Sequence, residues 1–170
     1  KGISLNILID FKFGGDIYSG TNVRLTQWGL HKQTLENREG GIIVEGATQT
    51  GTNADGSPAY EPFSSTLNQE QIKNYWYNLG ERCQENFIYD ASFVKLRQVS
   101  LEYTLPGRIL SKTPFSNLTL SLSGRNLAIL YKNIDNVDPE SSYSDSNAQG
   151  LDYFAMPGTR TYGFNLRVAF

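Results

Sequence analysis

The segment that decides the fold is the carboxy-terminal one, Thr161-Tyr-Gly-Phe-Asn-Leu-Arg-Val-Ala-Phe170. Every second side chain in it is large and apolar: Tyr162, Phe164, Leu166, Val168 and Phe170. The side chains between them are small or polar. Successive side chains of a strand point to opposite faces, so this segment has one apolar and one polar face. An alternating strand that ends on an aromatic residue is typical of bacterial outer-membrane β-barrels.

Three earlier segments show the same alternation, and the sequence therefore predicts four strands, at about 3–13, 93–105, 117–130 and 159–170. We expect the apolar positions to face lipid: Ile3, Leu5, Ile7, Ile9, Leu118, Leu120, Leu122, Phe164, Leu166 and Val168. The polar positions Glu102, Arg125, Asn165 and Arg167 should face the lumen. The apolar parity of the second strand changes at Arg97, which indicates either that the strand leaves the lipid there or that it contains a bulge.

The connections differ in length. The link between Leu105 and Asn117 is short, whereas the links at about 14–92 and 131–158 are long and rich in Gly, Asn, Ser, Asp and Tyr. Outer-membrane barrels have short periplasmic turns and long extracellular loops. We therefore expect both long links to be extracellular and Phe170 to be periplasmic. Within the first, Asn68–Arg82 has the composition of a short helix.

Composition excludes several classes of protein. No apolar run approaches the roughly 18 residues that a membrane helix needs. A net charge of −2 argues against nucleic acid as a partner, because its binding needs clustered basic charge. The single Cys83 excludes an internal disulfide framework and is expected to be an inert loop thiol.

Four strands cannot close a barrel, and an open edge in lipid would leave backbone groups unpaired at several kcal/mol each. The chain also begins at Lys1 without an initiating Met. We therefore expect the other strands to come from the same, longer polypeptide. A soluble four-stranded half-sandwich would also leave its apolar faces exposed unless a second sheet covered them.

Three motifs resemble the carboxy-terminal part of the SusC/RagA-type TonB-dependent transporters of the Bacteroidetes outer membrane. They are YDASFVKLRQVSLEYTLP (Tyr89–Pro106), NLTLSLSGRNLAIL with NIDNVDPE (within Asn117–Glu140) and PGTRTYGFNLRVAF (Pro157–Phe170). Upstream, Gly14–Asn22, Thr34–Gly46 and Ala54–Glu61 resemble the penultimate long loop of that family. The resemblance covers nearly the whole chain.

The resemblance implies an all-β fold, a transmembrane antiparallel β-barrel of 22 strands with a plug, of which this chain would be the last four strands. It implies import of glycans or peptides across the bacterial outer membrane. The implied partners are a SusD-like surface lipoprotein that acts as a lid, TonB through a part absent from this chain, the rest of the barrel, and outer-membrane lipid and lipopolysaccharide. It also implies that Tyr162, Phe164, Leu166, Val168 and Phe170 form an assembly signal for the insertion machinery.

No set of residues has the pattern of a catalytic or cofactor site, so we expect a protein that is not an enzyme and has no cofactor or metal. His31 has no nearby Cys or second His and is expected on a surface loop. Asp135, Asp138, Glu140 and Asp145 could ligate calcium, but a solvated loop is the favoured interpretation. Asn53, Asp55 and Ser57 have the pattern of a turn.

Five aromatic residues of the first long link are candidates for contact with the lid or the substrate: Trp28, Tyr60, Tyr75, Trp76 and Tyr77. Aromatic faces stack on sugars and anchor protein interfaces. The alternative is that they pack the loop against itself. Arg97 and Arg160 could bind lipopolysaccharide phosphates through their guanidinium groups, or form salt bridges to a neighbouring loop.

Two other functions fit the pattern. One is a different outer-membrane barrel, a porin or an adhesin. The other is a soluble carbohydrate-binding β-sandwich.

Overall fold

The structure is a computed structural model that describes residues 2–144 and 147–170. It contains two compact units. The first, called the sheet unit here, comprises the chain up to Ser19 together with Ile88–Phe170. The second, the inserted unit, is the continuous segment Gly20–Phe87. Each unit is described by itself.

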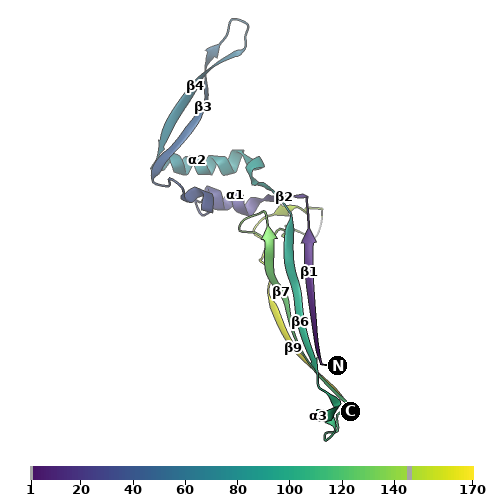
Figure 1. The fold of residues 1–170 in the computed structure, drawn as a ribbon. Helices are drawn as coiled ribbons and strands as arrows, with labels where there is room; N and C mark the ends of the chain where they lie inside the picture. Colours follow the sequence, from purple (N-terminus) through teal and green to yellow (C-terminus); the bar gives the residue numbers. More distant parts are fainter. Residues whose placement is uncertain (1, 145–146) are drawn as a thin grey trace. The chain divides into compact units, whose positions relative to one another are not determined.

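The sheet unit is built on four long antiparallel strands (Figure 1). They are β1 (Ile3–Lys12), β6 (Phe93–Thr104), β7 (Asn117–Lys132) and β9 (Thr161–Ala169), side by side in the order β1-β6-β7-β9. Each lies where the alternating pattern predicted a strand. The two ends of the chain lie at the same end of this sheet (Figure 1). The short link between β6 and β7 contains α3 (Gly107–Leu110).

The pairing register gives the sheet one apolar face. Residues that pair directly across an antiparallel ladder point to the same side. One row across the four strands consists of Ile3, Tyr103, Leu120 and Leu166, and the next of Leu5, Leu101, Leu122 and Phe164. The row between them, on the other face, consists of Ser4, Glu102, Ser121 and Asn165. Ile3 and Phe164 are 74% and 67% exposed, so the apolar face is not packed into a core of the described chain.

A bulge at Arg97 keeps the apolar face continuous. In the β1–β6 ladder, Leu8 pairs with Gln98 and Ile9 with Leu96, so Arg97 is skipped. The β6–β7 ladder also shifts between Leu96 and Gln98. One extra residue reverses the parity of a strand, which places Leu96 opposite the apolar Ile9. The bulge is therefore the explanation of the parity change at Arg97.

A small three-stranded sheet lies at one end of the sheet unit. Its strands are β2 (Asp16–Ser19), β5 (Ile88–Asp90) and β8 (Leu151–Asp152), in the order β5-β2-β8. Ile17, Ala91, Ile134 and Val137 form the buried core beneath it, with Tyr89 against them. Because β2 and β5 pair antiparallel, the inserted unit leaves and rejoins the sheet unit on neighbouring strands.

The inserted unit contains regular structure where a long loop with one short helix was predicted. Its elements are α1 (Gly20–Gln27), the 3₁₀ turn η1 (Lys32–Leu35), β3 (Gly40–Thr52), β4 (Pro58–Asn68), α2 (Gln69–Arg82) and the 3₁₀ turn η2 (Gln84–Phe87). The predicted helix at Asn68–Arg82 is present as α2, and Asn68 and Gln71 form a capping box at its start. The chain is thus mainly β-strand. The predicted all-β fold did not include the helix α1.

Helices α1 and α2 approach each other closely at Gly80. A Cβ added to Gly80 would lie 3.1 Å from the Val23 carbonyl oxygen of α1 and 2.6 Å from the side chain of Gln27. Ile72 is 2% exposed and Phe87 1%, so the inserted unit buries apolar side chains of its own. The helices can approach this closely because Gly80 has no side chain.

Strands β3 and β4 form a long two-stranded hairpin (Figure 1). Seven consecutive pairs, from Ile43 opposite Thr66 to Gln49 opposite Tyr60, keep one register. The ring of Phe63 covers Gly46 on the opposite strand, where an added Cβ would meet it at 3.0 Å. Cross-strand aromatic cover of a glycine stabilises a strand that would otherwise be weak there.

None of the helices in the described part of the chain is long and apolar enough to cross a membrane.

Candidate functional site

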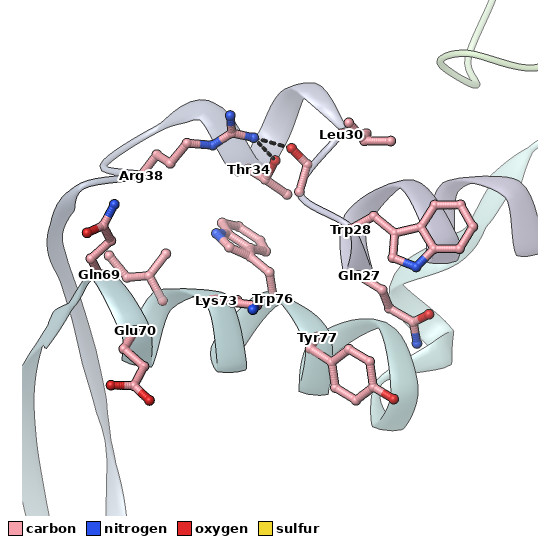
Figure 2. Close-up of a pocket in the computed structure, with 12 residues that line it drawn as sticks. Gln27, Trp28, Leu30, Thr34, Arg38, Gln69, Glu70, Lys73, Trp76 and Tyr77 are labelled. Carbon is pink, nitrogen blue, oxygen red and sulfur yellow. Dashed lines mark hydrogen bonds between the residues drawn. The ribbon is translucent and has the colours of Figure 1, made fainter.

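The principal candidate site is a cavity within the inserted unit, about 810 Å³ in volume. One wall consists of Gln27 and the residues that follow α1, including Trp28 and Leu30. The other wall is the face of α2 that carries Ile72, Trp76 and Tyr77. Figure 2 shows Trp76 rising from α2 toward the segment that carries Thr34 and Arg38. The volume lies in the usual range for small-molecule pockets.

Polar groups surround this aromatic cavity. The Arg38 guanidinium donates hydrogen bonds to the Gly29 carbonyl oxygen and, at 3.4 Å, to Thr34 Oγ1 (Figure 2). Glu70 and Lys73 of α2 also line the cavity. Flat apolar faces beside a few hydrogen-bonding and charged groups suit a ligand or a partner side chain that has both apolar and polar parts.

Of the five aromatic residues predicted to act together, the structure brings four to this region. Trp28, Trp76 and Tyr77 line the cavity, and Tyr75 packs edge-on against Trp76 with 5.1 Å between ring centroids. Trp76 Nε1 is buried and has no hydrogen-bond acceptor among the described residues. Trp28 is 62% exposed in the described chain.

Tyr60 is separate from the other four. It lies on β4 opposite Gln49, it is exposed, and it does not line the cavity. Tyr60 is close to Tyr75 in sequence, so the sequence did not show this separation. The separation arises because the hairpin places Tyr60 away from α2. Contact of any of these five residues with a lid or a substrate stays a prediction.

A second cluster, of ion pairs, lies in the sheet unit. The ammonium of Lys95, whose side chain is 1% exposed, pairs with Asp138 and Glu140. Its nitrogen also lies 4.9 Å from the centroid of the Phe93 ring. Asp138 and Glu140 belong to the link after β7, so the cluster ties this link to β6. A buried cation is tolerated because two carboxylates compensate it.

Arg97 extends the cluster. Its guanidinium donates to Asp10 Oδ2 at 2.8 and 2.9 Å and to both carboxylate oxygens of Glu140 at 2.5 Å. Bulges commonly redirect one side chain, and here the bulged residue reaches one carboxylate on β1 and one in the link after β7. Two partners were predicted for the Arg97 guanidinium: lipopolysaccharide phosphates, or salt bridges to a neighbouring loop. The ion pair with Glu140 corresponds to the second. Its contact with lipopolysaccharide stays a prediction, as does that of the exposed Arg160.

The remaining polar candidates have structural roles. Asp138 and Glu140 of the acidic run bind cations of the protein itself, and Asp145 lies outside the described residues. Among the residues that the structure describes, no three His, Cys, Asp or Glu side chains are grouped to hold a metal ion. Asp55 accepts hydrogen bonds from the backbone and side chain of Ser57, which close a turn and lower the pKa of the Asp55 carboxyl.

The expectation of a surface position for His31 is wrong. The side chain is 7% exposed, and its Nδ1 accepts the backbone N–H of Gln33 as the amino-terminal cap of η1. Without knowledge of η1, a lone polar residue in a predicted loop gave no sign of burial. Cys83 is a partly buried free thiol at the carboxy-terminal end of α2.

The terminal aromatic residue has one ring contact. Phe170 is 86% exposed, but its ring centroid lies 5.4 Å from that of Phe115 in the link between β6 and β7. Tyr162, Phe164 and Leu166 are also exposed. Their predicted role as an assembly signal, together with Val168, stays a prediction.

The second long link contains an aromatic cluster that the alternating pattern did not predict. Tyr143, Tyr153 and Phe154 pack edge-on in series, with 6.3 and 5.1 Å between ring centroids. Phe154 has a φ of +52°, which is uncommon for a bulky residue. The adjacent letters Tyr153-Phe154 were a signal, but their packing on Tyr143 depends on the fold of the link.

Comparison with known proteins points to one family. No protein-family model matches the chain. TonB-dependent receptor P3 of Formosa agariphila is 28% identical to it over 176 residues, which cover all of this chain and 15% of that protein. TonB-dependent receptor P26 of the same organism is 32% identical over 89 residues, which cover 49% of this chain and 9% of that protein. The chain thus spans less than a sixth of either relative.

Solved structures share the fold of this chain. Structures of the RagAB peptide importer in the open-open and closed-closed states match the whole chain, each with a TM-score of 0.59 and with 18% and 15% identity. The match covers 16% of the solved chain in each case. At this identity the likeness concerns the fold. The resemblance to SusC/RagA-type TonB-dependent transporters, predicted from the sequence, is confirmed by the sequence and fold comparisons together.

Proposed function

We propose, from the similarity of this chain to SusC/RagA-type TonB-dependent transporters, that it forms the last four strands of a plugged, 22-stranded barrel in the bacterial outer membrane. The complete protein would import glycans or peptides. Energy would reach it from TonB through a part of the polypeptide outside this chain. No step of this function needs a catalytic residue.

The observation that carries the proposal is the two-faced sheet of β1, β6, β7 and β9. One face presents rows of exposed apolar side chains, and the other presents Ser, Thr, Asn, Glu and Arg. A barrel wall needs this division, because one face contacts lipid and the other contacts water or the plug. β1 and β9 each have one unpaired edge in the described chain, at which the remaining strands of the barrel would pair.

The aromatic cavity supports the proposal of a surface lipoprotein as partner. Trp28 and Tyr77 are 62% and 49% exposed at its rim. The indole N–H of Trp76 is buried beside them and lacks an acceptor in the described chain. Exposed aromatic residues beside a cavity are characteristic of interface hot spots. Contact with the lid, or with cargo beneath it, would cover these side chains.

Cysteine labelling tests the barrel assignment in outer-membrane preparations of the full-length protein. Cys83 is first replaced by Ser, so that each variant has one thiol within this segment. The matched pair is Leu166→Cys, on the apolar face, and Asn165→Cys, its polar neighbour. We expect a lipid-soluble maleimide to label position 166 and a water-soluble one to label position 165. Equal labelling of both positions by the water-soluble reagent would contradict a membrane-spanning strand.

Uptake measurements separate the transporter from the other two functions. Deletion of the TonB gene should abolish import by a TonB-dependent transporter, whereas passage through a porin should continue. A soluble sandwich should fractionate without detergent. Uptake of labelled oligosaccharides and peptides by wild-type cells would then distinguish the two cargo classes.

A further inference from the structure

The hairpin of β3 and β4 has one protected edge and one open edge. Within residues 2–144 and 147–170, each of these strands pairs only with the other. β4 carries Pro58 and Pro62. A proline has no N–H, so the outer edge of β4 cannot donate hydrogen bonds at these two positions to an added strand. Proline on an edge strand is a known protection against further pairing.

The outer edge of β3 has no such protection. From Ile43 to Gln49 the strand has no proline, no lysine and no register shift. Ala47 lies opposite Pro62. The ladder tolerates Pro62 only where the proline nitrogen faces away from β3. In such a pair, the residue directly opposite also directs its backbone N–H and C=O groups outward. Ala47, and by alternation Ile43, Glu45 and Gln49, therefore direct their N–H and C=O groups to the outer edge.

The charge of the hairpin indicates what can pair there. Residues 40–68 contain Glu45, Asp55 and Glu61, and no Lys, Arg or His. Glu45 belongs to the open edge itself. A second copy of the hairpin would place like charges together, which is unfavourable between strands. A strand that carries Lys or Arg would instead complement the hairpin.

We propose that the outer edge of β3, from Ile43 to Gln49, binds a basic cargo peptide in extended conformation as a third strand of the hairpin. The peptide backbone would pair with the outward N–H and C=O groups, and a Lys or Arg would lie beside Glu45. Backbone pairing depends little on sequence, which suits a transporter of mixed peptides. The proposal rests on the import function above and specifies peptides as the cargo.

The test uses the purified full-length protein in detergent and three synthetic nonapeptides. The first alternates lysine and valine, the second alternates glutamate and valine, and the third is the lysine peptide with every backbone nitrogen methylated, so that neither of its edges can donate hydrogen bonds. Hydrogen exchange reports the amides of Ile43–Gln49. We expect the outward amides to exchange fast in the free protein and to be protected by the first peptide alone.

Two matched pairs of variants locate the site. Ala47→Pro removes an outward donor, so it should weaken binding of the lysine peptide at least ten-fold, whereas Ala47→Val keeps the donor and should bind normally. Glu45→Gln should weaken binding roughly two- to five-fold, the effect of one cross-strand charge pair. Glu61→Gln removes the same charge from β4, one strand farther from the peptide, and should change binding less.

Three outcomes would overturn the proposal. The outward amides could be protected already in the free protein, which would mean that another segment or a partner protein covers the edge. The glutamate or methylated peptide could protect them as well as the lysine peptide does. The two variants of each matched pair could bind the lysine peptide equally well. For Ala47→Pro this result counts only if the inward amides of Val44 and Thr48 stay protected, which shows that the hairpin is still formed. Binding without TonB-dependent uptake would contradict the import function only, and uptake without binding would contradict this proposal only.

Discussion

Lys95 and Glu140, 45 positions apart in sequence, form an ion pair in which the lysine side chain is almost completely buried. Asp138 provides a second carboxylate to the same ammonium. Through these contacts, the link after β7 is held against β6. The stability of the link should therefore depend on Lys95 more than on the other members of the cluster.

Lys95→Met should loosen this link. Loss of one partner of a buried ion pair costs about 3–5 kcal/mol. Asp138 and Glu140 are 22% and 37% exposed and can regain water, so we expect about 2 kcal/mol in the free energy of local opening. Hydrogen exchange at Ile134 and Val137 measures it. Glu140→Gln is the control, because Lys95 keeps Asp138; an effect as large as that of Lys95→Met would show that Lys95 is not the central group.

Phe170→Ala should reduce the amount of protein in the outer membrane more than it reduces stability. The ring is 86% exposed, and its contact with Phe115 is worth about 0.5–1.5 kcal/mol. Surface abundance and the temperature of barrel unfolding are measured together. Phe115→Ala removes the same ring contact but leaves the terminal residue, so its abundance should be normal. Normal abundance with a large loss of thermal stability in Phe170→Ala would make Phe170 a packing residue instead.

Gly80→Ala should destabilise the inserted unit. Alanine favours a helix by about 1 kcal/mol over glycine. The added methyl, however, meets the Val23 backbone oxygen at 3.1 Å, and overpacking of this kind costs about 1–3 kcal/mol. We expect a net loss near 1 kcal/mol, measured by hydrogen exchange of α1 and α2. Gly107→Ala in α3 is the control, since its Cβ meets nothing within 4 Å; a stabilising Gly80→Ala would refute the close helix contact.

The segment around Asp90 should weaken in acid. The side chain and backbone N–H of Ser92, followed by Asn133, donate to the Asp90 carboxylate and lower its pKa below the usual 3.8. A carboxylate with a lowered pKa contributes stability above its unfolded pKa, and that stability is lost as the pH falls through the folded pKa. We therefore expect faster exchange at Ser92 below about pH 4. Asp90→Asn should show no such step, and an unchanged step in this variant would assign the acid effect to another group.

Arg160→Ala should reduce the lipopolysaccharide that purifies with the full-length protein. Arg160 directly precedes β9, is exposed, and shares parity with the apolar-face residue Tyr162. A guanidinium binds phosphate through two parallel hydrogen bonds, which lysine cannot reproduce. Arg160→Lys should therefore retain only part of the bound lipid, measured by mass spectrometry. Unchanged lipid content in both variants would favour a salt bridge to a neighbouring loop.

The sequence by itself determined the four long strands and their two faces. Alternation with a period of two is a local property, and burial or lipid contact of one face is sufficient to select it. The row of Leu5, Leu101, Leu122 and Phe164 was therefore foreseeable, as was α2, whose cap at Asn68 is equally local. The motifs also indicated the resemblance to SusC/RagA-type transporters that the comparisons support.

Only the tertiary structure decided how polar and aromatic side chains are grouped. The bulge at Arg97 brings its guanidinium to Asp10 and Glu140, and the fold of the second long link brings Glu140 to Lys95. The β3–β4 hairpin separates Tyr60 from Trp76, although both lie in one predicted loop. Such groupings depend on chain reversals and on contacts between residues far apart in sequence, and a periodic pattern carries no information about either.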